Sequence, residues 1–292
     1  PTPRFNDGLY DSTDLINCHS HLTYKMVSEN FAEKTNFIPH ALPEDVFFPL
    51  GKHAISAYRR QLLGPDRQDH FVAFWMNRNA KRKRPNDVLL SWKHFTDKLK
   101  EQGKQDATLI MHTDPNDSEG PNLEMTAEML GIKDSVFFSN QRVDFEKINI
   151  LHNMADVVFN ISYAEGFGLG TLEAMQCGTP IIAIKTGGLT RQVVDHRDGS
   201  ENGVALPVEV KSLVGSQTVP YIYEDYVSSE TVGEAFYKMY SMTDEERSAL
   251  SKKVRDYVLS EFSYQDTVDR WHETMIDLLE NWEYKNYAVE TL

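Results

Sequence analysis

The chain has 292 residues, of which 40% are hydrophobic and 25% are charged, and its formal net charge is −14. This composition is ordinary for a soluble globular protein, and the length allows one large domain or two modest ones. No stretch reaches the roughly 20 apolar residues of a membrane-spanning helix, and the net negative charge argues against nucleic acid as a ligand.

The first 46 residues differ in pattern from the rest of the chain. Residues 14–17 predict one strand, a short helix follows it, and residues 37–46 form a connector rich in turn-forming residues. This portion is too short to predict a large domain of its own.

Beyond this connector, short apolar runs alternate with helical patterns. Strands are expected at residues 71–75, 109–111, 136–138, 157–161 and 180–184, with helices between them. Such alternation predicts a parallel sheet covered on both faces, which binds its ligands at the carboxyl ends of the strands. After about residue 230 the pattern is helical, and an apolar stripe over 268–282 predicts a long terminal helix.

The segment that follows the fourth expected strand combines glycines with two carboxylates. A loop with three glycines precedes a helix start near Thr171, and unpaired N–H groups there suit a phosphate. Glu165 in the loop and Glu173 in the first helical turn are able to accept hydrogen bonds from sugar or ribose hydroxyls. Each feature also has a purely structural interpretation: glycines after a strand often form only a turn, and a glutamate often stabilises a helix start.

The whole segment is more specific than its parts. It reads Glu165-Gly-Phe-Gly-Leu-Gly-Thr-Leu-Glu173, continues to Cys-Gly-Thr-Pro180, and is followed by Gly187-Gly188 and Asn202-Gly203. It resembles the Glu-x7-Glu motif of glycosyltransferase family 4, a retaining group with the GT-B architecture. Arg191 stands where that family often has an acidic residue.

A second element strengthens the resemblance. Arg78 and Lys83 match the family's Arg-x4-Lys spacing after the first strand of the donor domain. Cations beside two carboxylates suit a diphosphate. For Arg82 and Arg84, in the same basic run, surface charge remains the alternative.

The resemblance implies an α/β fold of the GT-B type. Residues 1–46 would be a remnant of the N-terminal acceptor domain with its linker, so that domain is expected to be truncated or missing from the chain. Residues 47–260 would form a Rossmann-like donor-binding domain, and residues 261–292 a C-terminal helix that crosses back toward the N-terminal portion.

The resemblance also implies roles for individual residues. Glu165 would contact the donor sugar and Glu173 the ribose, while Arg78 and Lys83 would stabilise the departing diphosphate. The backbone of Gly166, Phe167, Gly168 and Leu169 would face sugar and diphosphate, and the loop that ends at Val143 would lie near the base.

The function implied is retaining transfer of a hexose-type sugar from a UDP- or GDP-linked donor to a saccharide, lipid or protein acceptor. No metal or cofactor is expected, and Asp114 and Asp117 are interpreted as turn formers. Two distant cysteines indicate a reducing compartment, the cytoplasm, with at most peripheral membrane contact. The alternatives are a non-catalytic nucleotide-sugar-binding module and a DNA-base glucosyltransferase, the latter opposed by the negative charge.

Overall fold

The structure is a computed structural model that describes residues 4–217 and 219–283. Its centre is a six-stranded sheet in the order β5-β4-β3-β6-β7-β8, in which every pairing is parallel. The strands are β3 (Phe71–Met76), β4 (Ala107–His112), β5 (Val136–Ser139), β6 (Val157–Asn160), β7 (Ile181–Ile184) and β8 (Gly203–Leu206). The Rossmann-like parallel sheet predicted from the sequence is therefore confirmed, and β8 extends it by one strand.

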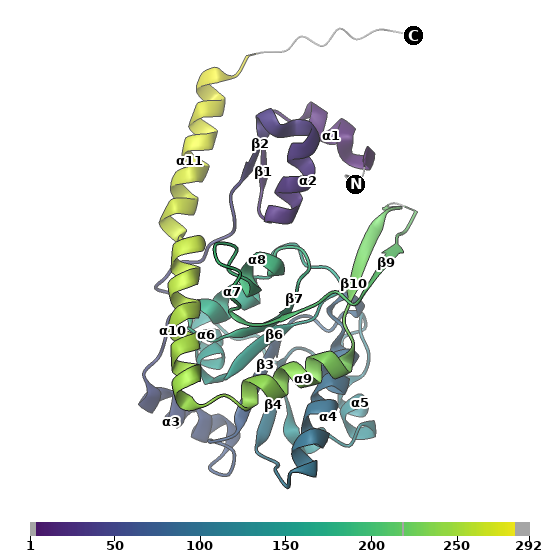
Figure 1. The fold of residues 1–292 in the computed structure, drawn as a ribbon, viewed down its shortest axis with the longest axis vertical. Coiled ribbons are helices and arrows are strands. Elements are labelled where there is room, and N and C mark those ends of the chain that lie inside the picture. Colours follow the sequence, from purple (N-terminus) through teal and green to yellow (C-terminus); the bar gives the residue numbers. More distant parts are fainter. Residues whose placement is uncertain (1–3, 218, 284–292) are drawn as a thin grey trace.

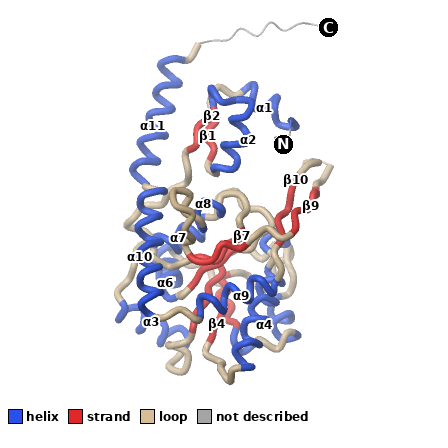
Figure 2. Tube along the Cα trace, viewed as in Figure 1, coloured by secondary structure: helices blue, strands red, loops and turns tan. Residues whose placement is uncertain are grey.

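Helices cover both faces of this sheet (Figures 1 and 2). One group comprises α4 (Pro85–Glu101), α5 (Leu123–Met129) and α9 (Ser229–Tyr240), in which α5 and α9 each pack on α4. The other comprises α3 (Lys52–Leu63), α6 (Phe145–Met154), α7 (Leu169–Gln176), α8 (Leu189–Val193) and α10 (Asp244–Glu261). Right-handed crossovers place the two groups on opposite faces because the chain runs along the sheet in both directions from its centre.

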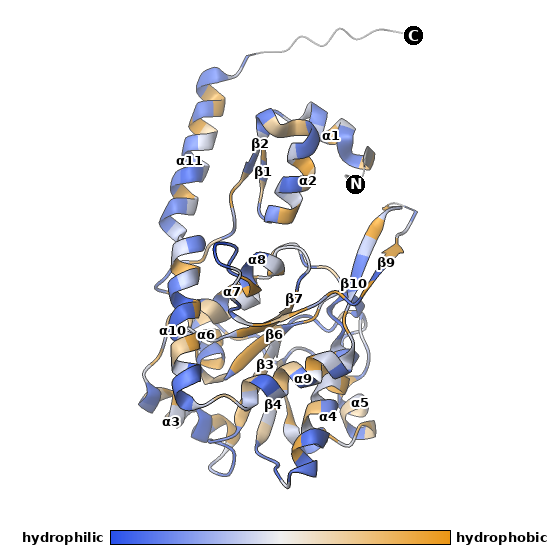
Figure 3. Cartoon of the chain, in the orientation of Figure 1, coloured by the Kyte–Doolittle hydropathy of each residue, from blue (hydrophilic) through white to orange (hydrophobic). Residues whose placement is uncertain are grey.

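Burial on both faces explains why the strand sequences are continuously apolar. Figure 3 shows hydrophobic residues along the central strands, whereas the helices around them carry both hydrophilic and hydrophobic residues. The core contains fully buried aromatic side chains from sheet and helices, among them Trp75, Trp92, Phe95, Phe159 and Phe236. Phe159 of the sheet meets Phe236 of α9 edge to face, with ring centroids 4.8 Å apart, an arrangement that adds to the free energy of burial.

The N-terminal unit is a small parallel pair of strands with a helix between them. It contains β1 (Ile16–Cys18), α2 (His21–Phe31) and β2 (Thr35–Phe37), preceded by η1 (Arg4–Asn6) and α1 (Asp7–Ser12), with η2 (Ala32–Lys34) before β2. The predicted strand and short helix are present, and β2 was not predicted. A connector without helix or strand then leads to α3, and the unit lies on the α8 side of the molecule (Figure 1).

Two features complete the chain. Strands β9 (Val210–Val214) and β10 (Ile222–Tyr226) form an antiparallel hairpin that projects from the main body (Figure 1). Helices α10 and α11 (Tyr264–Asn281) follow each other and run along one side up to the N-terminal unit. The long terminal helix is thus confirmed, whereas residues 284–292 of the predicted C-terminal segment lie outside the described residues. The division at residues 46 and 260 stays a prediction.

Candidate active site

The candidate site lies at the carboxyl ends of the two central strands. Strands β3 and β6 are neighbours, but the chain continues from β3 toward β4 on one side and from β6 toward β7 on the other. Open parallel sheets bind ligands at such a reversal of strand order. A cavity of about 340 Å³ opens there, and five of the predicted residues line it: Lys83, Glu165, Phe167, Gly168 and Leu169.

Lys83 and Glu165 form an ion pair inside this cavity. The Lys83 ammonium contacts Oε2 of Glu165, and their side chains are only 9% and 12% exposed. Asn160, at the end of β6, donates to the same oxygen at 3.3 Å. Burial lowers the pKa of the Lys83 ammonium, and the hydrogen bond to Glu165 opposes this effect. The site therefore holds a buried cation and a largely buried anion in direct contact, and the exposed Arg82 guanidinium lies 3.9 Å from the same carboxylate oxygen.

Glycines let two loops approach each other beside this pair. Gly168, at the N-cap of α7, has φ +92°, a conformation that costs little only for glycine. In the β7–α8 loop, a Cβ on Gly187 would lie 1.8 Å from the carbonyl oxygen of Glu165. A Cβ on Gly188 would lie 2.5 Å from Cα of Phe167. The double glycine thus allows close contact between the β7–α8 loop and the loop that carries Glu165.

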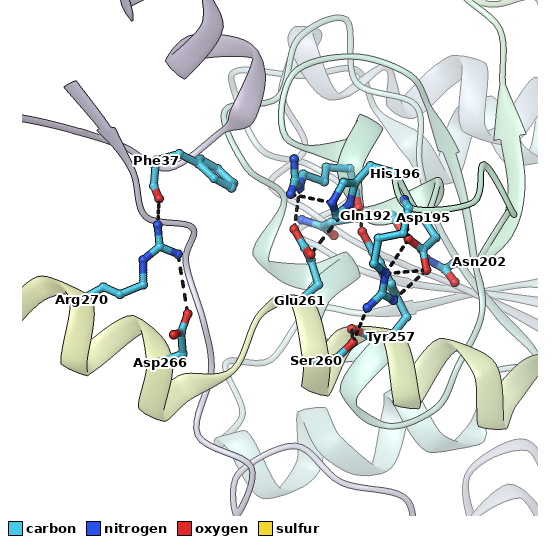
Figure 4. Close-up of polar contacts among 12 residues, drawn as sticks. Phe37, Gln192, Asp195, His196, Asn202, Tyr257, Ser260, Glu261, Asp266 and Arg270 are labelled. Atoms are coloured by element: carbon cyan, nitrogen blue, oxygen red, sulfur yellow. Dashed lines mark hydrogen bonds and ion pairs between the residues drawn. The ribbon is translucent and has the colours of Figure 1, made fainter. Parts of the chain in front are cut away.

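Gln192 of α8 holds the glycine-lined loop in place through hydrogen bonds. Its buried amide donates to the carbonyl oxygen of Phe167 at 2.8 Å and accepts from the Thr171 hydroxyl at 2.6 Å. Asn202 donates in turn to the carbonyl oxygen of Gln192 at 2.8 Å; both side chains are drawn in Figure 4. Gln192 was not predicted, because a single glutamine on a short helix carries no periodic signal.

Two of the predicted charged residues do not line this cavity. The Arg78 guanidinium is 62% exposed at its side chain and binds both carboxylate oxygens of Asp117, at 2.7 and 3.1 Å. Glu173 lies one turn into α7, and its Oε2 is 3.0 Å from Nε2 of the fully buried His152 in α6. The structure therefore brings together Lys83 and Glu165, but neither Arg78 nor Glu173 contacts this pair.

The remaining predicted residues lie to either side of the cavity. Gly166 lines a neighbouring cavity of about 370 Å³ that faces the N-terminal unit. Val143 is half-buried and packs against a small cluster formed by Phe47, Ile148 and Cys177. The roles predicted for Gly166 and Val143 stay predictions.

His40 lines both cavities and was not identified from the sequence. Its ring stacks on His19 with centroids 3.9 Å apart and meets the edge of Phe167 at 5.0 Å. Burial, followed by the nearby His19, lowers the pKa of His40. It was overlooked because it lies within a connector of turn-forming residues. It is the point where the N-terminal segment reaches the loop of Glu165.

Arg191 links three parts of the chain. It forms an ion pair with Glu261 at the end of α10, and its guanidinium lies 5.1 Å from the ring centroid of Phe37 in β2. Arg270 of α11 donates to the carbonyl oxygen of Phe37 and pairs with Asp266 at 3.6 Å (Figure 4). An arginine at position 191 thus ties the C-terminal helices and β2 to the β7–α8 region.

Within the described ranges, no group of three or more histidine, cysteine or acidic residues is arranged to hold a metal ion. Asp114 and Asp117 accept backbone N–H bonds from Asn116 and Glu119, as expected of turn formers. None of the helices described has the length and apolar character needed to cross a membrane.

Comparison with known proteins places this geometry in a family. The family model described as "Glycosyl transferases group 1" matches residues 63–216, a region that contains the ion pair, both glycine loops and every lining residue of the cavity except His40. The chain belongs to this family. The match covers more than half of this chain and includes both Lys83 and Glu165.

Two curated relatives with longer matches to this chain are D-inositol 3-phosphate glycosyltransferases. A D-inositol 3-phosphate glycosyltransferase of Corynebacterium jeikeium is 30% identical over 203 residues, which cover 68% of this chain and 46% of the relative. That of Stackebrandtia nassauensis is 35% identical over 170 residues, covering 57% of this chain and 37% of the relative. The chain thus spans about half the length, or less, of the curated relatives it matches.

Solved structures of glycosyltransferases share the fold. Sucrose-phosphate synthase from Thermosynechococcus elongatus superimposes with a TM-score of 0.72 at 20% identity, covering 94% of this chain and 61% of the synthase. Anabaena HepE, solved in complex with UDP-glucose, gives a TM-score of 0.70 at 20% identity, covering 91% of this chain and 64% of HepE. The group 1 chain has the GT-B-like α/β fold with a parallel sheet.

Proposed function

We propose that this chain is the donor-binding part of a retaining, metal-independent glycosyltransferase of family 4 that acts in the cytoplasm. It would transfer a hexose from a nucleotide-diphosphate sugar to an acceptor. The proposal is carried by one observation: the buried Lys83–Glu165 pair faces the glycine-lined start of α7 in a cavity at the reversal of strand order. The first and last glutamates of the Glu-x7-Glu motif are Glu165 and Glu173.

The cavity supports a division of labour between these residues. Backbone N–H groups at the start of α7 and the Lys83 ammonium supply positive charge for a diphosphate. The diphosphate carries the negative charge that develops as its bond to the sugar breaks. The Glu165 carboxylate accepts hydrogen bonds from sugar hydroxyls. To bind the diphosphate, the Arg78 guanidinium would have to leave the Asp117 carboxylate. To bind the ribose, Glu173 would have to give up its contact with His152.

The names and bound ligands of similar proteins indicate which substrates to test first. HepE has been solved with UDP-glucose, so a uridine-diphosphate sugar is the first donor to test, with GDP-linked sugars as the comparison. Curated relatives are D-inositol 3-phosphate glycosyltransferases, so a phosphorylated cyclitol is the first acceptor.

The test compares Glu165→Gln with Glu128→Gln. Glu128 lies on α5 and its side chain is 70% exposed, so it serves as a matched control. Nucleotide binding is measured by calorimetry with UDP and GDP sugars. Turnover is measured as release of the nucleoside diphosphate, with and without inositol phosphate. Glu165 is assigned to the sugar hydroxyls, and loss of one preorganised polar contact in an active site typically lowers turnover about 100-fold or more, so we expect such a loss only for Glu165→Gln.

Each outcome bears on the proposal. Turnover that is unchanged in Glu165→Gln contradicts the role of Glu165, and a wild-type chain that binds no nucleotide sugar contradicts the donor site. Binding without any turnover instead supports a non-catalytic nucleotide-sugar-binding module.

A further inference from the structure

Arg84, directly after Lys83, has an unusual backbone conformation. Its φ and ψ are 56° and 44°, and it is the one residue other than glycine with positive φ in the described part of the chain. This left-handed conformation costs an arginine on the order of 1 kcal/mol. Arg84 is the N-cap of α4, a position that is normally extended. Other contacts must therefore stabilise this turn.

The Arg84 side chain provides those contacts. It is only 6% exposed, so the surface interpretation of this charge is wrong. Its Nε donates to the Asp87 carboxylate at 2.9 Å, and its Nη2 donates to the carbonyl oxygen of Val227 at 2.9 Å. Its Nη1 is buried and has no hydrogen-bond partner among the described residues. A buried guanidinium with an unpaired N–H is costly, so its presence here calls for a physical explanation.

Two tyrosines flank the guanidinium. Its central carbon lies 5.2 Å from the ring centroid of Tyr163 and 5.7 Å from that of Tyr226, which ends β10. The two rings are 4.4 Å apart. Cation–π contacts of this kind are stronger when the cation is desolvated. The side chain therefore joins the start of α4 to two segments that are distant in sequence.

One of these segments carries Glu165. Tyr163 precedes Glu165 by two residues, and its backbone N–H donates to the carbonyl oxygen of Arg82 at 3.0 Å. The turn that ends in Lys83 and the loop that holds Glu165 are thus connected twice, once through the backbone and once through the Arg84 guanidinium. Lys83 lies between Arg82 and Arg84 in sequence, and its ion-pair partner Glu165 lies two residues after Tyr163.

We propose that Arg84 is a positioning residue that holds the Lys83 turn against the Glu165 loop and so keeps the two charges in contact. The left-handed backbone sets the direction of the turn, and the guanidinium fixes it between Tyr163, Tyr226 and Val227. The consequence for sugar transfer rests on the proposed function, whereas the effect on Lys83 itself does not.

The test measures the chemical accessibility of the Lys83 amine. Pulse acetylation followed by peptide mass spectrometry compares Lys83 with Lys81, an exposed lysine of the same turn. In the wild-type chain we expect Lys83 to react at least about tenfold more slowly than Lys81, because local opening must precede its modification.

Arg84→Gly removes the guanidinium but accepts the left-handed backbone without strain. We expect its Lys83 to react about tenfold faster than in the wild type. Asn86→Gly, an exposed position in the first turn of α4, controls for added backbone flexibility and should leave Lys83 protected. Arg84→Lys keeps the charge but loses the planar fork, and its Lys83 should react faster than in the wild type.

Lys83 that stays equally protected in Arg84→Gly and Arg84→Lys overturns the proposal. If Arg84→Gly does not fold, the rate in Arg84→Lys decides alone. Turnover of UDP-glucose in Lys83→Ala, Arg84→Gly and the double variant gives a second measurement. If Arg84 acts through Lys83, the double variant loses no more turnover than Lys83→Ala, whereas independent roles multiply the losses. A wild-type chain without nucleotide binding contradicts the donor site and leaves the acetylation result decisive for Arg84.

Discussion

At the scale of single residues, burial of the Lys83–Glu165 pair has two free-energy costs and one free-energy gain. Both charges leave water, and their attraction in the low dielectric of the cavity offsets part of that loss. Removing Glu165 leaves the Lys83 ammonium buried without a counterion, and removing Lys83 leaves Glu165 with only the exposed Arg82 as a cationic partner, so either loss is more costly than removing both. The pair is therefore poorly suited to stabilise the fold alone, and its place in a cavity is better explained by ligand binding.

The charge of Lys83 predicts a pH dependence of nucleotide binding. Only the protonated ammonium attracts a diphosphate, and burial lowers its pKa below the ordinary lysine value. We therefore expect the affinity for UDP to fall as the pH rises through this lowered pKa. In Lys83→Arg the side chain stays protonated, so its affinity should persist to higher pH. Calorimetric titration of both proteins over the alkaline range measures this difference, and identical profiles would contradict it.

Unfolding of the chain does not explain such a loss of UDP affinity at high pH. The unfolded chain binds the Lys83 proton more tightly than the folded one, because the folded pKa is the lower of the two. The contribution of Lys83 to the free energy of unfolding therefore increases with pH between these two pKa values. A melting curve recorded at each pH separates this contribution from the loss of binding.

Sequence patterns identified residues that stand in motifs and missed those that act through packing. Glu165 and Lys83 were predicted because glycines, a helix start and a fixed spacing surround them. His40, Gln192 and Arg84 were missed because their roles depend on partners far along the chain, such as Phe167 and Tyr226. Arg78 follows the expected spacing, yet its partner Asp117 comes from a loop whose position the sequence does not specify.

At the scale of elements, the β6–α7 and β7–α8 loops behave as one packed unit. The N–H of Gly188 donates to the carbonyl oxygen of Glu165 at 3.2 Å, and Gly187 lies too close to that carbonyl for any side chain. The direction of the Glu165 backbone therefore depends on the neighbouring loop.

Gly187→Ala tests this dependence against Gly199→Ala. Both glycines have positive φ, +50° and +76°, so both variants pay a backbone cost of about 1 kcal/mol. At Gly199 an added Cβ meets nothing within 4 Å, whereas at Gly187 it meets the Glu165 carbonyl. We expect Gly187→Ala to lower both the melting temperature and UDP affinity, and Gly199→Ala to affect mainly the melting temperature. Equal UDP affinity in both variants would show that the loops are independent.

Elements were predictable where burial leaves a clear pattern. Strands β3, β4, β6 and β7 are apolar along nearly their whole length because helices cover both faces of the sheet. The β9–β10 hairpin was not predicted, since most of its residues are exposed or only half-buried. The three-residue strand β2 is too short for periodicity to reveal.

At the scale of the whole molecule, the C-terminal helices connect regions at opposite ends of the sequence. Helix α10 packs on α7, and α11 reaches β2 through Arg270. Trp271 also lies 6.0 Å from the ring of His19. The N-terminal unit is thereby held beside the loop of Glu165 through His40 and Phe167.

Arg270→Ala is expected to loosen the N-terminal unit selectively. Loss of the hydrogen bond to Phe37 removes a contact between α11 and β2. Hydrogen exchange should become faster in β1 and β2 while the central sheet keeps its protection, because local units open independently of the global core. Lys252→Ala, at an exposed position of α10, serves as the control. Unchanged exchange in β2 would show that this contact does not hold the unit.

On the proposed function, the ion pair would also discriminate against incomplete ligands. Any molecule that draws Lys83 away from Glu165 leaves a carboxylate whose remaining cationic partner is the exposed Arg82, at 3.9 Å. The diphosphate of a free nucleotide would satisfy only the ammonium, because its ribose is assigned to Glu173, and a free sugar would satisfy only the carboxylate. An intact donor would compensate both charges of the pair. The site would then bind the spent product less well than the intact donor, a difference that favours turnover over product inhibition.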